Sequence, residues 1–494
     1  MARQGNRKTA RRSSSVTRRR VLQSGAAAAA LPAGLATGAQ PVGPVMAALS
    51  SYMDAARERA LPDEVAEKTK HHVLDTFAAM ISGAHLAPGR AAIKFARGYG
   101  GERLATVVGS DVLCGPIEAA LANGVLAHAD ETDDSHAPSL SHPGCAVVPA
   151  ALAVGEALGI DGRHFLRAVA LGYDVGPRVT MCLGVPALSR DAHLSSHSIA
   201  GTFGAAAAAG CAAALDAQRM RWLFDYTAQQ SSGIAAWQRD SDHIEKAFVF
   251  GGMPARSGVT SALLVRAGWT GIDDILSGPD NFLLAHGRSA DAAVLVDKLG
   301  ERYEVMRTNI KKWSVGSPIQ AALDGLELLL QRRPFTPGEV RKVVVRLGTR
   351  SASVVNNRDI PDICLQHMIA VMLIDRTVSF DAAHDVARMR DPAVLRERAK
   401  VELVGDAELE ARAPRREAIV EVALADGTEL AEHVKAVRGT SDNPMPRAEV
   451  VAKCRDLITP VLGAAKCAAL IERVLALESM ANVRDLRGLL RLRG

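Results

Sequence analysis

The sequence is poor in the residues that build covalently linked or metal-held cores. Its seven cysteines are an odd number spread along 494 residues, and no C-x-x-C pair occurs. This pattern disfavours a disulfide framework and a zinc ribbon, and the spacing argues against an iron–sulfur cluster held by neighbouring cysteines. Aromatic residues are also few, at 4%, whereas alanine and glycine are abundant. The mixture favours closely packed helices over a β-sandwich.

Acidic residues are absent from the first 40 positions, which contain eight lysines and arginines. Without these eight positive charges, the formal net charge of +5 becomes −3 for the rest of the chain. The basic pI therefore belongs to the N-terminal segment, and the composition gives no argument for a nucleic-acid partner. After this segment, no stretch reaches the roughly 18–20 uninterrupted apolar residues of a membrane span.

The N-terminal segment has the pattern of an export signal. Residues 17–23 read TRRRVLQ and resemble a twin-arginine motif, and a mildly apolar run follows at 25–35. Thr37, Gly38 and Ala39 supply small residues for cleavage before Gln40. We predict that residues 1–39 are a twin-arginine signal peptide and that the protein lies in the periplasm, free of the membrane after cleavage. The alternative is a disordered basic tail.

Residues 119–149 hold three histidines and four acids in a short span. Ile117, Leu121, Val125 and His128 follow helical spacing, which predicts a helix opened by Gly115-Pro116 with His128 on its apolar stripe. A polar loop follows and closes at Pro143-Gly144, before a second apolar run at 146–158. Titratable groups held between two buried helices suit an acid–base site. The alternative is a solvated loop beside a core histidine. Composition alone favours neither interpretation over the other.

The loop sequence HADETDDSHAPSLSHPG resembles the signature of the MmgE/PrpD family. This family contains 2-methylcitrate dehydratase, cis-aconitate decarboxylase and iminodisuccinate epimerase. Three further segments resemble family segments in the expected order: HSIAGTFG from His197, GGMPARSG after Lys246, and GTSDNPMP from Gly439. The resemblance covers residue 45 to the C-terminus. It implies a homodimer formed by a helical domain.

The resemblance also implies a set of site residues. Glu131 aligns with a family aspartate, Ser135 with a threonine, and His367 with a tyrosine, so this chain departs from the family there. The predicted catalytic residues are Glu131, Ser135, His142, His197 and His367, and the predicted substrate-binding residues are Lys246, Lys311 and Asp134.

Several of these residues also have an alternative interpretation. His142 can cap a turn, Lys246 can form a surface ion pair worth little energy, and Lys312 can replace Lys311. Asp134 can position the loop, and His367 can be a core residue. No residue is assigned to a metal or a cofactor.

The expected fold is mainly α with a smaller α+β domain. We predict a helical domain over 45–300, an α+β lid domain over 301–444, and C-terminal helices at 445–494 that return to the helical domain. Asp161 is a predicted helix N-cap, and the alanine- and glycine-rich stretch at 201–214 permits close helix packing. Strands are predicted at 339–347 and around Val401, with a hairpin over 418–434 that turns at Asp426-Gly427.

The leading functional hypothesis is a cofactor-independent lyase or isomerase that removes a proton next to a carboxylate of a small di- or tricarboxylate. Among such reactions, dehydration is favoured over epimerisation and decarboxylation. One rival is a metal hydrolase with ligands among Asp133, Asp134, His136, His142 and His197, although no strong metal-ligand spacing occurs. The other rival is an exported carboxylate-binding protein without turnover.

Overall fold

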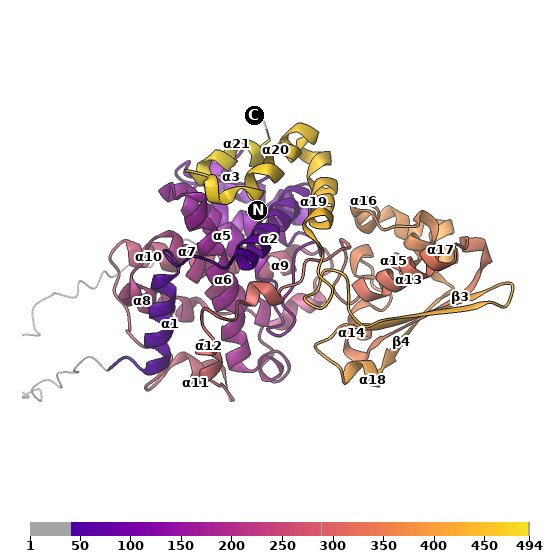
Figure 1. Cartoon of the computed structure of the whole chain (residues 1–494), viewed down its shortest axis with the longest axis horizontal. Helices are drawn as coiled ribbons and strands as arrows, with labels where there is room; N and C mark the ends of the chain where they lie inside the picture. Colours follow the sequence, from indigo (N-terminus) through magenta and orange to yellow (C-terminus); the bar gives the residue numbers. More distant parts are fainter. Residues whose placement is uncertain (1–40, 288, 493–494) are drawn as a thin grey trace, which may run out of the picture. The chain divides into compact units, whose positions relative to one another are not determined.

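The computed structural model describes residues 41–287 and 289–492, so the predicted signal peptide lies outside the described residues. Within them, the fold is mainly helical with small sheets, as predicted, and 21 α-helices are present (Figure 1). The first twelve are α1 (Pro44–Ala55), α2 (Asp63–Gly83), α3 (Ala87–Tyr99), α4 (Pro116–Ala127), α5 (Gly144–Leu158), α6 (Gly162–Leu183), α7 (Ser196–Ala212), α8 (Ala217–Gln230), α9 (Ile244–Ala247), α10 (Met253–Arg266), α11 (Phe282–His286) and α12 (Ala293–Val296). The others are α13 (Gln320–Arg332), α14 (Thr349–Val355), α15 (Leu365–Asp375), α16 (Phe380–His384), α17 (Pro392–Arg398), α18 (Ala407–Glu410), α19 (Arg447–Leu462), α20 (Ala464–Leu475) and α21 (Arg487–Leu490).

Local sequence signals account for several helix ends. The Asp161 side chain accepts a hydrogen bond from the backbone N–H of His164, so the predicted N-cap of α6 is confirmed. Pro88 and Gly89 lie inside the first turn of α3. Proline is tolerated there because the first N–H groups of a helix have no intrahelical partner. A two-stranded hairpin of β1 (Ala105–Thr106) and β2 (Leu113–Cys114) also interrupts the helical first half.

Close packing of α6 against α7 uses the predicted small residues. Gly172 and Gly176 of α6 face Gly204 of α7, and a Cβ atom at Gly176 would overlap the carbonyl oxygen of Ala200. A side chain at Gly176 would therefore push the two helices apart. The stretch from Ile244 to Arg266 is long and apolar enough to cross a membrane, but most of it is buried, and α10 packs on α7 and α4.

A second hydrophobic cluster surrounds a four-stranded sheet with the order β4-β3-β5-β6. Its strands are β3 (Val340–Gly348), β4 (Val401–Asp406), β5 (Ala418–Leu424) and β6 (Glu429–Val434). β3 runs parallel to β4 and antiparallel to β5, and β5 pairs with β6 as the predicted hairpin. Gly427 in its turn has φ of +86°, a conformation that glycine adopts at little cost. Helices α13 and α15 contribute further apolar side chains to this cluster.

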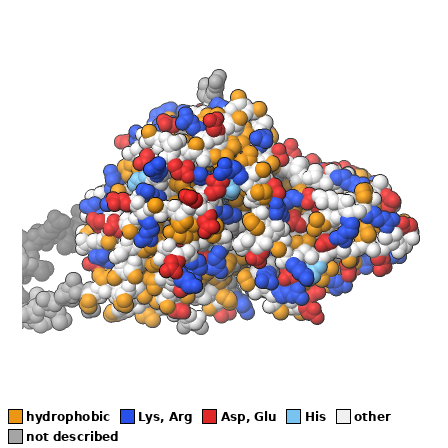
Figure 2. Space-filling model, in the orientation of Figure 1, with side chains coloured by type: hydrophobic (Ala, Val, Ile, Leu, Met, Phe, Trp, Pro, Cys, Tyr) orange, Lys and Arg blue, Asp and Glu red, His pale blue; other side chains and the backbone are white. Residues whose placement is uncertain are grey.

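The C-terminal helices pack against the start of the chain. α19 and α20 both contact α2, and their buried side chains belong to the same hydrophobic cluster as those of α1–α10. The Lys453 ammonium of α19 lies 2.6 Å from Asp75 Oδ1 on α2 and donates to the Thr132 carbonyl at 3.0 Å. The last helices thus reach the acidic loop that follows α4. Figure 2 shows acidic and basic side chains interspersed over the face in view.

Candidate active site

The acidic loop between α4 and α5 is buried. α4 ends where His128 forms its C-cap, and α5 begins at Gly144, so both predicted helices are present. Every residue from 128 to 136 is at most 4% exposed. A solvated loop is therefore excluded, and these polar groups must find partners inside the protein.

Asp134 holds this loop in place. Its Oδ2 accepts hydrogen bonds from Tyr173 at 2.6 Å and from the His72 ring at 2.9 Å. Its Oδ1 accepts the backbone N–H of Gly144 at 3.1 Å, at the start of α5. These three protein donors use both oxygens of the carboxylate that the sequence predicts to bind substrate. The geometry fits the alternative, in which Asp134 positions the loop.

Asp133 lies among the histidines instead. Its Oδ2 is 2.9 Å from His128 Nδ1, and its Oδ1 is 3.3 Å from His142 Nδ1. The ring centroids of His142 and His197 are 5.2 Å apart. Phe250 stacks on His197 with centroids 3.9 Å apart and on His128 at 4.5 Å. The structure thus brings the rings of His142 and His197 together, and both rings contact Phe250. An acid–base site requires such neighbouring titratable groups.

Two lysines from distant segments meet at Glu131. The Lys246 ammonium forms an ion pair with Glu131 Oε1. Lys311 Nζ donates to the Glu131 carbonyl oxygen at 2.7 Å and lies 3.5 Å from Glu131 Oε2 and 3.7 Å from Asp133 Oδ1. Lys312 pairs with Glu327 instead. Lys311, rather than Lys312, is therefore the lysine at the cluster.

A short backbone bridge places Lys311. The N–H of Ser135 donates to the Asn309 carbonyl at 3.0 Å, and the Asn309 N–H donates back at 2.8 Å. The next residue, Ile310, donates to the carbonyl oxygen of Gly439, which has φ of +94°. A Cβ atom at Gly439 would overlap the Ile310 carbonyl. The GTSDNPMP segment therefore needs its glycine so that the backbone before Lys311 can approach.

Burial fixes which groups carry charge at neutral pH. Burial lowers the pKa of His142 to about 4, although Asp133 opposes this shift. Burial also lowers the pKa of His197 well below its usual value, and His142 adds to the shift. Burial alone would raise the pKa of Glu131, but Lys246 and Lys311 hold it well below the usual range. His142 and His197 are thus neutral beside an ionised carboxylate, and their free ring nitrogens can accept a proton.

His367 lies apart from this cluster. It belongs to the first turn of α15, is fully buried, and neither ring nitrogen has a hydrogen-bond partner within the described residues. Burial lowers its pKa to about 4, and Arg398 and Arg388 add to the shift. No hydrogen bond, ion pair or ring–ring contact among the described residues joins His367 to the other predicted site residues. The geometry fits the alternative of a core position.

Several neighbours of the cluster were not predicted. His243 has a left-handed backbone with φ of +66°, and its Nε2 lies 3.9 Å from Glu131 Oε1. A histidine three residues before Lys246 was the available signal. Trp237 packs edge-on against Phe250 at 4.7 Å. Single aromatic residues in an apolar sequence give no local sign of such a contact.

Two residue groups bring metal-binding atoms within 4.8 Å of one another: His128 with Glu131 and His243, and His128 with Asp133 and Cys145. The first group shares Glu131 with the ammonium groups of Lys246 and Lys311. A bound cation would have to displace or face those positive charges. The second would need the thiolate of Cys145, whose pKa burial raises well above its usual value. These donor sets fit a metal ion poorly.

Two family domains and several known proteins match this chain. The MmgE/PrpD N-terminal domain matches residues 47–294, and the MmgE/PrpD C-terminal domain matches residues 313–478. The chain is 25% identical to the cis-aconitate decarboxylase-like protein oryM of Aspergillus oryzae, over 92% of this chain and 98% of that protein. It is 24% identical to cis-aconitate decarboxylase of Aspergillus terreus, over 87% and 92%. The human cis-aconitate decarboxylase is 29% identical over 44% of this chain and 45% of its own.

The two domain matches leave only short segments of the described chain uncovered. The matched ranges include the acidic loop, Lys246 and the four-stranded sheet, whereas Lys311 lies in the short gap between them. The relatives that align along nearly the whole chain are lyases by name. The chain therefore belongs to the MmgE/PrpD family, and its role is that of a lyase-type enzyme.

Proposed function

We propose that this protein is a lyase that acts on a small tricarboxylate of the aconitate type by moving a proton at a carbon next to a carboxylate. One observation carries the proposal: the neutral imidazoles of His142 and His197 lie beside two lysines that converge on Glu131. Lysine ammonium groups suit substrate carboxylates, and neutral imidazoles suit proton transfer. In the proposal, the side chains of the chain itself move the proton.

Substrate binding is coupled to proton transfer in this arrangement. A substrate carboxylate can replace Glu131 as the partner of Lys246, whose side chain remains partly exposed. The negative charge brought beside His142 favours the imidazolium, so it raises the pKa of His142 from about 4. His142 therefore becomes a better proton acceptor when the polyanion is bound. Asp133, on the other side of the ring, holds it in orientation.

The leaving group distinguishes two candidate reactions. Decarboxylation is supported by the names of relatives that align along most of the chain. In that case the proton goes to a substrate carbon as carbon dioxide leaves. Dehydration, which the sequence favoured, needs a proton donor for the departing hydroxide. The ammonium group of Lys311, 3.7 Å from the Asp133 carboxylate beside His142, supports this second candidate.

The test is a panel of cis-aconitate, citrate and 2-methylcitrate incubated with the purified protein in deuterated water. Proton NMR would report deuterium next to a carboxylate, and a carbon dioxide trap would separate decarboxylation from hydration or dehydration. We expect turnover of at least one tricarboxylate with deuterium incorporated at that carbon. If all three acids remain unchanged and undeuterated, the proposed function is wrong.

A further inference from the structure

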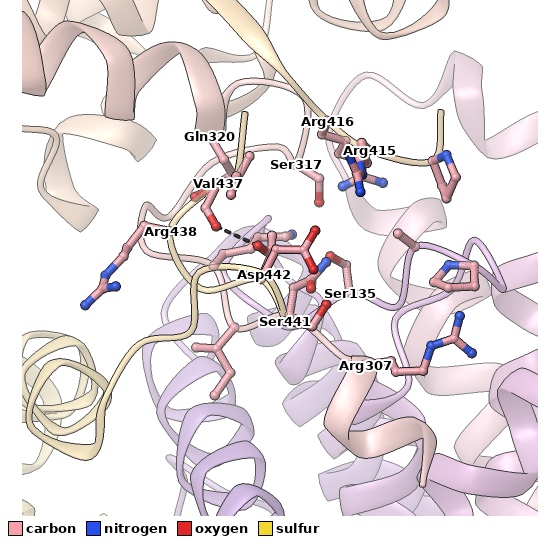
Figure 3. A pocket seen from close by; sticks show the side chains of 18 of the residues that line it. Ser135, Arg307, Ser317, Gln320, Arg415, Arg416, Val437, Arg438, Ser441 and Asp442 are labelled. Carbon is pink, nitrogen blue, oxygen red and sulfur yellow. Dashed lines mark hydrogen bonds between the residues drawn. The ribbon is translucent and has the colours of Figure 1, made fainter. Parts of the chain in front are cut away.

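A cationic cavity of about 170 Å³ adjoins the candidate active site. Ser135 and Lys311, which belong to that site, form part of its wall. Five further cationic residues line it, from segments far apart in the sequence: Arg307, Arg415, Arg416, Lys435 and Arg438. Figure 3 labels the four arginines. Among the lining residues, Asp442 is the single acid. The cavity therefore has an excess of positive charge at the edge of the proton-transfer cluster.

The arginines of the cavity wall differ in what they bind. Arg438 donates to Glu449 at 2.8 Å and to Asn443 at 2.7 Å, and it points away from the cavity in Figure 3. Arg307 pairs with Glu304 at 2.9 Å. The guanidinium groups of Arg415 and Arg416 make no hydrogen bond or ion pair with any residue in 41–287 or 289–492. Both lie in the segment just before β5, at the rim of the cavity (Figure 3).

A buried hydroxyl faces the same space. Ser317 is 7% exposed, and its Oγ has no hydrogen-bond partner among the described residues. Figure 3 shows it beside the cavity, between Gln320 and Arg416. A buried hydroxyl without a partner is unfavourable by itself, so a ligand oxygen that accepts its proton stabilises this arrangement.

We propose that Arg415, Arg416 and Ser317 form a subsite for a substrate carboxylate distinct from those held by Lys246 and Lys311. A planar guanidinium binds a carboxylate through two parallel N–H bonds, which a lysine cannot do. The subsite selects tricarboxylates over dicarboxylates, because only the former have a further carboxylate to place there. This inference rests on the proposed function, and it names the structural basis of substrate choice.

The test compares binding of two unreactive acids, tricarballylate and glutarate, by titration calorimetry. In the Arg416→Gln variant, we expect affinity for tricarballylate to fall about tenfold or more and affinity for glutarate to change less than threefold. Arg415→Gln should have the same selective effect in weaker form, because Arg415 is the more exposed of the two. The matched control is Arg438→Gln, which removes a guanidinium of the same wall that points away from the cavity. Circular dichroism establishes that each variant is folded.

Equal losses for the two acids, or no loss for either, would overturn the subsite. So would a wild-type protein that does not bind tricarballylate. The proposed function fails separately, if the wild type binds tricarballylate selectively but turns over none of the reactive tricarboxylates. In that case a selective effect of Arg416→Gln on binding would still support the subsite.

Discussion

The Nδ1 atom of His142 lies 3.3 Å from Oδ1 of Asp133, a carboxylate with no exposed surface. Asp133 stays ionised, because His128, His142 and Lys311 outweigh burial and keep its pKa well below the usual value. A carboxylate at this position favours the tautomer of His142 that carries its proton on Nδ1. The Nε2 lone pair is then free for a substrate proton. The pair thus places an ionised carboxylate beside a base, although the two atoms do not meet hydrogen-bond geometry in the free protein.

His142→Ala should remove most of the activity without unfolding the protein. A general base or acid typically contributes about 10²–10⁴-fold to the rate, and we expect kcat to fall by that factor. Steady-state kinetics on the substrate identified by the NMR panel measures the loss, and circular dichroism reports the fold. His85→Ala, at an exposed position, is the control. Near-full activity of His142→Ala would mean that the histidine is structural.

Lys246→Met should mainly weaken substrate binding. The ammonium of Lys246 is paired with Glu131 in the free protein. In the proposed mechanism it forms its ion pair with a substrate carboxylate instead. We expect KM to rise about tenfold or more, with a smaller change in kcat. Initial rates over a range of substrate concentrations separate the two parameters. Lys94→Met, on the exposed side of α3, should behave as wild type. A lower kcat at unchanged KM would assign Lys246 to the chemical step.

Asp134→Ala should destabilise the protein. The substitution leaves the buried donors Tyr173, His72 and Gly144 N without their shared acceptor. Loss of one partner in such a buried network lowers the free energy of unfolding by roughly 3–5 kcal/mol. Urea denaturation measures this difference, and Asp485→Ala at an exposed position is the control. A loss below about 1 kcal/mol would show that the loop does not depend on Asp134.

Stability should fall as the pH drops below about 6.5, the usual pKa of histidine. The folded pKa of His142 is about 4, so the unfolded chain binds the extra proton between these two values. The contribution of neutral His142 to the free energy of unfolding is therefore fully present above the pKa that His142 has in the unfolded chain. It is lost as the pH falls toward 4. His142→Gln should reduce the dependence of the unfolding free energy on pH by about 1.4 kcal/mol per pH unit in this window. Denaturant titrations at several pH values measure the slope, and an unchanged slope would contradict the shift.

Replacement of Arg18 and Arg19 by lysine should retain the protein in the cytoplasm. Twin-arginine export depends on the arginine pair before the apolar run, and lysine keeps the charge without the guanidinium. Cell fractionation followed by immunoblotting measures the distribution. Replacement of the nearby Arg11 and Arg12 by lysine is the matched control. Unchanged recovery in the periplasm would show that residues 1–39 do not direct twin-arginine export.

Local patterns along the chain were sufficient to predict the helices on both sides of the acidic loop, the N-cap at Asp161 and the β5–β6 hairpin. Each depends on residues within a few positions of one another, because apolar periodicity, capping and turn geometry are short-range effects. The loop composition and its neighbouring motifs likewise indicated the family. Composition did not decide whether the loop is solvated or buried. The structure decides it, because burial depends on the helices that pack around the loop.

The division of roles between Asp133 and Asp134 came only from the tertiary structure. The two carboxylates are adjacent in sequence, yet one faces the histidines and the other faces Tyr173 and His72. Lys246 and Lys311 reach Glu131 across 115 and 180 residues of chain. Residue type and spacing show that such groups are present, but not which of them meet. Those contacts, and the charges that burial imposes on them, depend on long-range packing that no short segment specifies.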